Sequence, residues 1–268
     1  MSFGDYIEVG RMDELARMDS SVHRLDARIK VLTTVAFIIA VMSFPRYEVS
    51  ALMPFFLYPV VLMMSGNIPP GYILRKVLIA APFALAVGIL NPVFDRETAV
   101  SIGSYGISGG WLSFASIAIR FILTVSAALS LVACTGIHRL CSGMARMGLP
   151  DVFAVQLQLL YRYLFVIAND ALRMMRAVEV RSVGRHVLRI RTYASIVGHL
   201  LLRSMDRAQR VYQAMVSRGY EGSVRVMSPT KLRMEDLVFL AGWIACFIVA
   251  RFWNISLWLG RVFTGEWK

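Results

Sequence analysis

The chain has 268 residues, of which 57% are hydrophobic and 17% are charged, and its mean hydropathy is +0.60. A typical soluble domain contains about 45–50% apolar and about 25% charged residues. The apolar content therefore exceeds what a single globular core can bury, which excludes an ordinary soluble domain and predicts segments covered by lipid. Lys and Arg outnumber Asp and Glu by 29 to 17, giving a formal net charge of +12.

Most of this positive charge falls in one block of the sequence. Residues 138–235 contain sixteen Lys or Arg and six Asp or Glu, so they carry +10 of the net charge. A strongly basic protein can bind nucleic acid, but here the basic residues lie beside strongly apolar segments. The positive-inside rule and anionic lipid headgroups already explain such residues. We therefore expect the lipid bilayer, and no nucleic acid, as a partner of this block.

The N-terminal segment, residues 1–28, is polar and lacks the apolar core of a cleavable signal peptide. We expect this segment to lie in the cytoplasm, with insertion directed by internal helices. Residues 29–134 follow, and their apolar runs predict transmembrane helices 1–4. The runs cover residues 31–44, 49–64, 77–90 and 111–134.

Some of these runs contain residues that are unusual in lipid. Pro54 and Pro59 lie inside the second run, and membrane helices tolerate proline because neighbouring groups satisfy the freed carbonyls. Arg120 interrupts the fourth run, and charged residues in spans usually face the protein interior. We therefore expect Arg120 to face a partner helix. The intervening loop, residues 93–110, is polar and rich in glycine.

A fifth apolar run covers residues 237–252, so residues 236–268 are predicted to form the last transmembrane helix and the C-terminal tail. Basic residues gather before the first run, between the second and third runs, and after the fourth. Cytoplasmic loops carry such an excess of Lys and Arg. An odd number of spans then places the N-terminus and the basic block inside and the C-terminus outside.

Residues 135–235 lie between the fourth and fifth runs and resemble neither a membrane span nor a loop. Two stretches in this block carry apolar residues three or four positions apart, with most arginines off the apolar stripe. This period is typical of amphipathic helices. The apolar stripe includes Leu157, Leu160 and Leu164 in the first stretch and Leu201, Met205 and Tyr212 in the second.

Both amphipathic stretches end in a similar way. In each, an alanine precedes an arginine by four positions, and glycine follows as a helix stop. Arginine offers a rigid fork of donors that can grip a carboxylate or several carbonyls, so the two ends could serve as docking pegs. They could also be two ordinary positive-inside residues. The residues at these ends are Ala177, Arg181 and Ser182 in the first, and Ala214, Ser217, Arg218 and Gly219 in the second.

Other functions find little support in the residues. The sequence has no G-x-x-x-x-G-K-[ST] loop to hold a nucleotide phosphate, so we expect no ATPase activity in this chain and no catalytic residues. Its four histidines are scattered without paired spacing, and no cluster of acids lies within a span, so we expect no metal site. A stand-alone membrane carrier or channel for a small cation remains an alternative.

Several motifs resemble the transmembrane T component of energy-coupling-factor (ECF) importers, in its cobalt/nickel branch of CbiQ-like proteins. The resemblance covers roughly residues 20–255. His23-Arg-Leu-Asp-Ala-Arg-Ile-Lys30 is similar to the family's entry motif, and the stretches 75–84 and 91–96 are similar to the metal branch. The family's two Ala-Arg-Gly signatures correspond to Val180-Arg181-Ser182, which keeps only the arginine, and to Ser217-Arg218-Gly219.

The resemblance implies an all-α, polytopic protein of a prokaryotic plasma (inner) membrane, with about five transmembrane helices and a cytoplasmic-side coupling-helix domain at residues 135–235. By the same resemblance, Arg181 and Arg218 dock onto two ATP-binding cassette (CbiO-like) subunits, which bind ATP and Mg²⁺, whereas this chain binds no cofactor. The other implied partners are a CbiM-like substrate-capture subunit and a small CbiN-like accessory protein. The implied cargo is cobalt or nickel, with a vitamin as the alternative for another T component.

Overall fold

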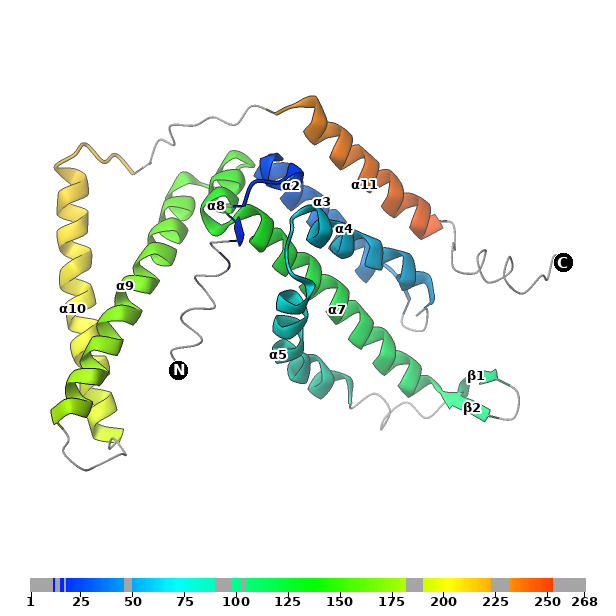
Figure 1. The fold of residues 1–268 in the computed structure, drawn as a ribbon, viewed down its shortest axis with the longest axis horizontal. Helices are drawn as coiled ribbons and strands as arrows, with labels where there is room; N and C mark the ends of the chain where they lie inside the picture. Colours follow the sequence, from blue (N-terminus) through cyan, green and yellow to red (C-terminus); the bar gives the residue numbers. More distant parts are fainter. Residues whose placement is uncertain are drawn as a thin grey trace. The chain divides into compact units, whose positions relative to one another are not determined.

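The computed structural model describes residues 12, 15–16, 18–45, 50–89, 98–102, 105–181, 190–222 and 232–252 (Figure 1). By its internal contacts the chain divides into two compact units. The first unit comprises Met1–Leu140 together with Thr230–Lys268, and the second comprises Cys141–Pro229. Helix α8 (Ile137–Arg146) contains the boundary between them.

The first unit contains the apolar runs. Most of their helices begin and end close to the predicted positions, but α5 begins at Pro70, seven residues before the predicted third run, and contains Arg75 and Lys76. Pro54 lies in a 3₁₀ segment that precedes a short α-helix, which breaks the second run in two. The helices of this unit are α2 (Ser21–Arg24), α3 (Ala27–Met42), η1 (Ser50–Phe56), α4 (Leu57–Ser65), α5 (Pro70–Gly88), α7 (Gly109–Thr135) and α11 (Met234–Phe252).

Helix α3 packs against both α7 and α11 in the first unit. Its Phe37 side chain is fully buried and stacks on Tyr58 of α4, with 4.7 Å between ring centroids. Phe247 of α11 also contacts the Phe37 ring, with 5.5 Å between centroids. Trp243 of α11 meets the Tyr58 ring edge-on, with 4.8 Å between centroids. Aromatic pairs in these geometries contribute beyond the area they bury. The core of this unit is therefore an aromatic cluster shared by α3, α4 and α11.

Two arginines bind the C-terminal end of α3, where backbone carbonyls lack helical partners. Arg120 of α7 donates from Nη2 to the Phe44 carbonyl at 3.1 Å and to the Pro45 carbonyl at 2.7 Å. Arg251 of α11 donates to the Ser43 carbonyl at 3.3 Å, with its guanidinium 4.6 Å from the Phe44 ring centroid. Cations also suit the negative end of a helix dipole. The prediction that Arg120 faces a partner element is confirmed.

The predicted polar loop at residues 93–110 contains a β-hairpin, which departs from the all-α prediction. Strand β1 (Thr98–Ile102) pairs antiparallel with β2 (Tyr105–Ser108), with an irregularity in register between Thr98 and Val100. The β-branched residues of this segment favour extended structure. A loop was predicted instead because the segment is also rich in glycine. The other regular elements of the described chain are helices.

Two described helices are long and apolar enough to cross a membrane, namely Gly110–Thr135 within α7 and α9 (Asp151–Arg181). Helix α7 corresponds to the fourth predicted span. Helix α9 lies in the basic block that was predicted to remain outside the membrane, so length and composition alone do not separate it from a span. The remaining apolar helices are shorter or carry more charge; α3, for example, has 16 residues, against the roughly 20 needed to cross.

Candidate functional site

The second unit is built around two long helices, α9 and α10 (Ile190–Val216), which pack against each other (Figure 1). They run antiparallel: Asp170 of α9 contacts Arg207 of α10, whereas Phe153, near the start of α9, lines the same groove as Met215, near the end of α10. In Figure 1 the pair is closest near the end of α9 and the start of α10. The divergence at the other end leaves a groove.

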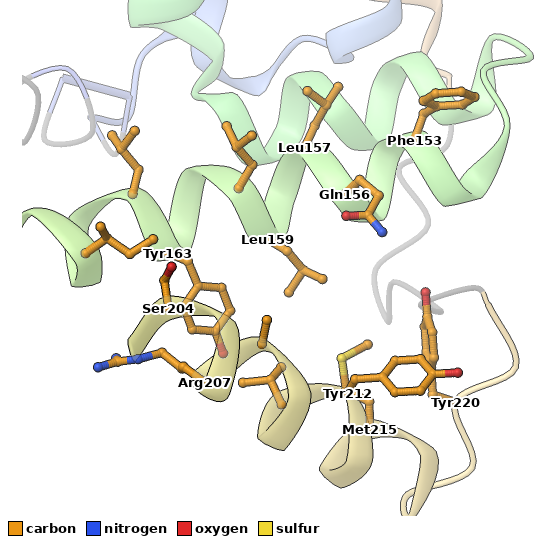
Figure 2. Close-up of a pocket in the computed structure, with 15 residues that line it drawn as sticks. Phe153, Gln156, Leu157, Leu159, Tyr163, Ser204, Arg207, Tyr212, Met215 and Tyr220 are labelled. Atoms are coloured by element: carbon orange, nitrogen blue, oxygen red, sulfur yellow. The ribbon is translucent and has the colours of Figure 1, made fainter. Parts of the chain in front are cut away.

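The groove has a volume of about 630 Å³ and is lined mainly by apolar side chains (Figure 2). Leu157, Leu160 and Leu164 line it from α9, and Tyr212 lines it from α10, as the apolar stripe predicted. Their period of three and four residues explains why they share one side of their helices. Leu160 remains 65% exposed, so the groove is open to a partner.

Leu201 and Met205 do not line this groove, although they belong to the predicted stripe of α10. They are 59% and 55% exposed. On a helix of 3.6 residues per turn, they lie toward one edge of the face that meets α9. The predicted apolar stripe of α10 is therefore divided between the groove and the surface beside it.

Several groove residues were missed by the sequence analysis. Phe153 lies one helical turn before Leu157, and its position on the same stripe could have identified it. Tyr220 lies beyond the end of α10, where helical periodicity no longer applies. Figure 2 shows Tyr212, Met215 and Tyr220 together at one end of the groove, with Ser204 and Arg207 toward the other.

A specific C-terminal turn places Tyr220 there. Gly219 has a φ of +80°, its N–H donates to the Val216 carbonyl at 2.9 Å, and the Tyr220 N–H donates to the Met215 carbonyl at 3.0 Å. These bonds form a Schellman motif, which glycine favours because it adopts positive φ without a Cβ penalty. Arg218 is consequently the last residue before the left-handed turn.

The two arginines predicted as docking pegs lie at the ends of their helices. Arg181 is the last residue of α9, and Arg218 follows the last turn of α10; both are exposed. The helices are antiparallel, and the 27 residues of α10 span about 40 Å at 1.5 Å per residue. The two guanidinium groups therefore lie at opposite ends of the helix pair, separated by roughly that length.

The residues next to these arginines are also accessible. Ala177, Ala214, Ser217 and Gly219 are exposed, and the Ser217 hydroxyl donates to the Gln213 carbonyl at 2.9 Å. Ser182 lies outside the described residues. Both described ends present small residues beside an arginine, which leaves the guanidinium accessible to a partner surface.

The side chains of this unit are suited to binding another protein surface. Across the described ranges, no three side chains of His, Cys, Asp or Glu are grouped closely enough to hold a metal ion. The groove offers apolar and aromatic surface together with the partly buried Arg207–Asp170 ion pair. Such a surface suits an apolar helix or another protein surface.

Comparison with known proteins gives one family and several relatives. Residues 18–229 match the family model described as cobalt transport protein, CbiQ. The energy-coupling factor transporter transmembrane protein EcfT of Heliobacterium modesticaldum is 29% identical over 261 residues, which make up 90% of this chain and 96% of that protein.

Two relatives with named metals match over shorter stretches. The cobalt transport protein CbiQ of Rhodobacter capsulatus is 33% identical over 91 residues, covering 33% of this chain and 37% of that protein. The nickel permease LarQ of Lactiplantibacillus plantarum is 27% identical over 120 residues, covering 45% of this chain and 44% of that protein.

Proposed function

The chain belongs to the CbiQ family of cobalt transport proteins, the T components of ECF importers, and we propose that it couples ATP hydrolysis by partner subunits to uptake of divalent cobalt or nickel. T components are membrane coupling subunits of prokaryotic transporters that work with ATPase and substrate-binding membrane subunits. In this proposal the chain performs no chemistry of its own, and ATP and Mg²⁺ are bound by its partners.

The observation that carries the proposal is the position of Arg181 and Arg218 at opposite, exposed ends of one antiparallel helix pair. A pair of ATPase subunits offers two equivalent sockets, and a rigid two-ended lever can reach both. Guanidinium groups suit sockets lined by carboxylates or carbonyls, which they bind through a bidentate fork. We therefore assign each arginine to one CbiO-like subunit.

The groove between α9 and α10 is the proposed contact for the substrate-capture subunit, of CbiM type, with a CbiN-like protein as a further member of the complex. Its apolar lining and its exposed Leu160 support this assignment. When the ATPase subunits close, the two helix ends move relative to each other, and the groove changes shape. That change would act on the capture subunit without any contact between this chain and the metal ion.

The proposed topology places the N-terminal segment and the α9–α10 pair on the cytoplasmic side, with α3, α4, α5, α7 and α11 in the membrane. The basic block then lies on the side that the positive-inside rule favours. Cobalt and nickel remain equal candidates for the cargo, because relatives named for each metal match this chain.

Reconstitution separates this proposal from its alternatives. The chain alone in liposomes should show no ATPase activity, no metal binding and no metal flux. Addition of its ATPase and capture subunits should produce ATP-dependent uptake of Co²⁺ or Ni²⁺. Metal flux through the chain alone would favour a channel, and uptake of a vitamin but not of a metal would assign it to another ECF branch.

A further inference from the structure

The side chain of Asp236 joins the N-terminal ends of two helices that are distant in sequence. Its Oδ2 accepts a hydrogen bond from the Arg233 N–H at 2.8 Å, so it caps the start of its own helix, α11. Its Oδ1 accepts from the Asp26 N–H at 2.9 Å, at the start of α3. The first four N–H groups of a helix lack internal partners, and one carboxylate here serves two such ends.

Asp26 continues the junction into α3. Its carboxylate accepts from the Arg28 N–H at 2.9 Å, which is the usual role of an N-cap aspartate. Asp236 and Asp26 are 3% and 5% exposed. Both N-termini are therefore closed by buried carboxylates, which is also the favourable sign for the positive end of a helix dipole.

Lys30 extends the junction to a third helix. It is 2% exposed, lies one turn after Asp26, and donates from Nζ to the Cys134 carbonyl near the C-terminus of α7 at 3.2 Å. Its ammonium also interacts electrostatically with Asp26 and Asp236. The junction therefore links the starts of α3 and α11 to the end of α7 through charged groups that are shielded from water.

Asp236 lies where the chain returns from the second unit to the first. Residues Cys141–Pro229 form the second unit, and α11 begins four residues after Thr230, where the chain re-enters the first unit. In chain order, α11 is the first described helix after α10, so its N-terminus is where the chain returns to the first unit. The hydrogen bonds at that point resist separation, because opening would leave buried carboxylate and amide groups unpaired.

We propose that Asp236 and Asp26 form a joint that stays closed throughout the transport cycle and anchors the returning chain to α3. This inference rests on the proposed coupling function and deepens it, since it names the contact that holds the chain returning from the second unit to α3. Asp236 acts as a positioning residue: it contacts neither metal nor nucleotide, and it holds the start of α11 to the start of α3.

A disulfide in place of the joint provides the test. The variant Asp26→Cys/Asp236→Cys, in a Cys246→Ser background, is reconstituted with the ATPase and capture subunits, and metal uptake is measured with the pair reduced and oxidised. Each sample serves as its own control, because the sequence is the same in both states. Asp236→Ala and the exposed neighbour Glu235→Ala are compared in the same assay.

The expected results are specific. Oxidation should form the cross-link and raise uptake above that of the reduced variant, toward the rate of the unmodified chain. Asp236→Ala should lower uptake about fivefold or more, as expected when a buried acceptor is lost at a cost above ~1 kcal/mol, and Glu235→Ala should leave uptake unchanged. Asp236→Asn keeps one carbonyl acceptor and should recover much of the loss.

Three results would contradict the proposed joint. Uptake could stop on oxidation, uptake could be unaffected in Asp236→Ala, or the two cysteines could fail to cross-link in membranes. Cross-linking is read on the chain alone, so it does not depend on transport. If the cysteine variant cross-links in membranes but the unmodified chain never supports uptake with its partners, the proposed function is contradicted instead.

Discussion

Arg207 of α10 donates a hydrogen bond to the carboxylate of Asp170 on α9, with 2.5 Å between Nη2 and Oδ2. The two side chains are 30% and 14% exposed, so solvent screens this ion pair less than a surface pair. The bond fixes the register of the antiparallel helices beside the groove. It therefore helps to hold the two arginine-bearing helices together.

Breaking this pair should loosen the second unit. We expect Arg207→Gln and Asp170→Asn each to lower the free energy of unfolding by about 1–2 kcal/mol, the range for a charge-assisted hydrogen bond that is partly exposed. The double variant should lose less than the sum of the single losses, because the interaction is shared. The measurement is a double-mutant cycle by thermal unfolding in detergent; additive losses would show that the contact is energetically unimportant.

The groove and the surface beside it should respond differently to the same substitution. Leu160 lines the groove and Leu201 does not, although the two are similarly exposed at 65% and 59%. Leu160→Asp should reduce co-purification of the capture subunit about tenfold, because an apolar partner surface would have to bury a carboxylate. Leu201→Asp is the matched control and should have a much smaller effect. Equal losses in the two variants would contradict the assignment of the groove.

Acidification should destabilise the segment that precedes α3, because it protonates His23. This side chain is 2% exposed and its ring nitrogens contact the Ser20 hydroxyl at 2.7 Å and the Leu15 carbonyl at 2.9 Å. Burial is the main cause that lowers the pKa of His23 below its ordinary 6.5. The hydrogen bond to the Leu15 carbonyl opposes this shift, Lys30 and Arg139 add to it, and Asp19 opposes it.

The sign of the pH effect follows from this lowered pKa. Between the lowered value and 6.5, the unfolded state binds more protons than the folded state, so stability falls as pH decreases through this window. We expect the thermal midpoint of the chain to decrease below pH 6.5 and to level off once the folded state is also protonated. His23→Gln should reduce this dependence, whereas the exposed His199→Gln should not; an identical pH profile in all three proteins would exclude His23 as the source.

The sequence predicted the parts of this protein that depend on local periodicity. Three leucines of the predicted apolar stripe of α9 lie together along the groove, since residues three and four apart share a helix side. The stripe of α10 was less informative, because periodicity shows that Leu201 and Tyr212 lie on similar faces but does not show which of them α9 meets. Gly219 was expected to stop α10, and its positive φ confirms that role.

Contacts between distant segments were not predictable from the sequence. Nothing near Asp236 indicated that its carboxylate would accept from the Asp26 N–H, 210 residues earlier. The same holds for Asp26, whose carboxylate caps the start of α3. The hairpin at residues 98–108 was missed because its strands are short and are placed among turn-forming residues.

The central claim is that Arg181 and Arg218 each engage one ATPase subunit. Native mass spectrometry of the co-expressed complex tests it most directly, using Arg181→Glu, Arg218→Glu and the double variant, with the exposed pair Arg203→Glu/Arg210→Glu as a control of equal charge change. We predict that each single variant weakens binding of one ATPase copy, that the double variant loses both, and that the control retains both. A double variant that keeps two ATPase copies and transports metal at the rate of the unmodified chain would contradict the claim.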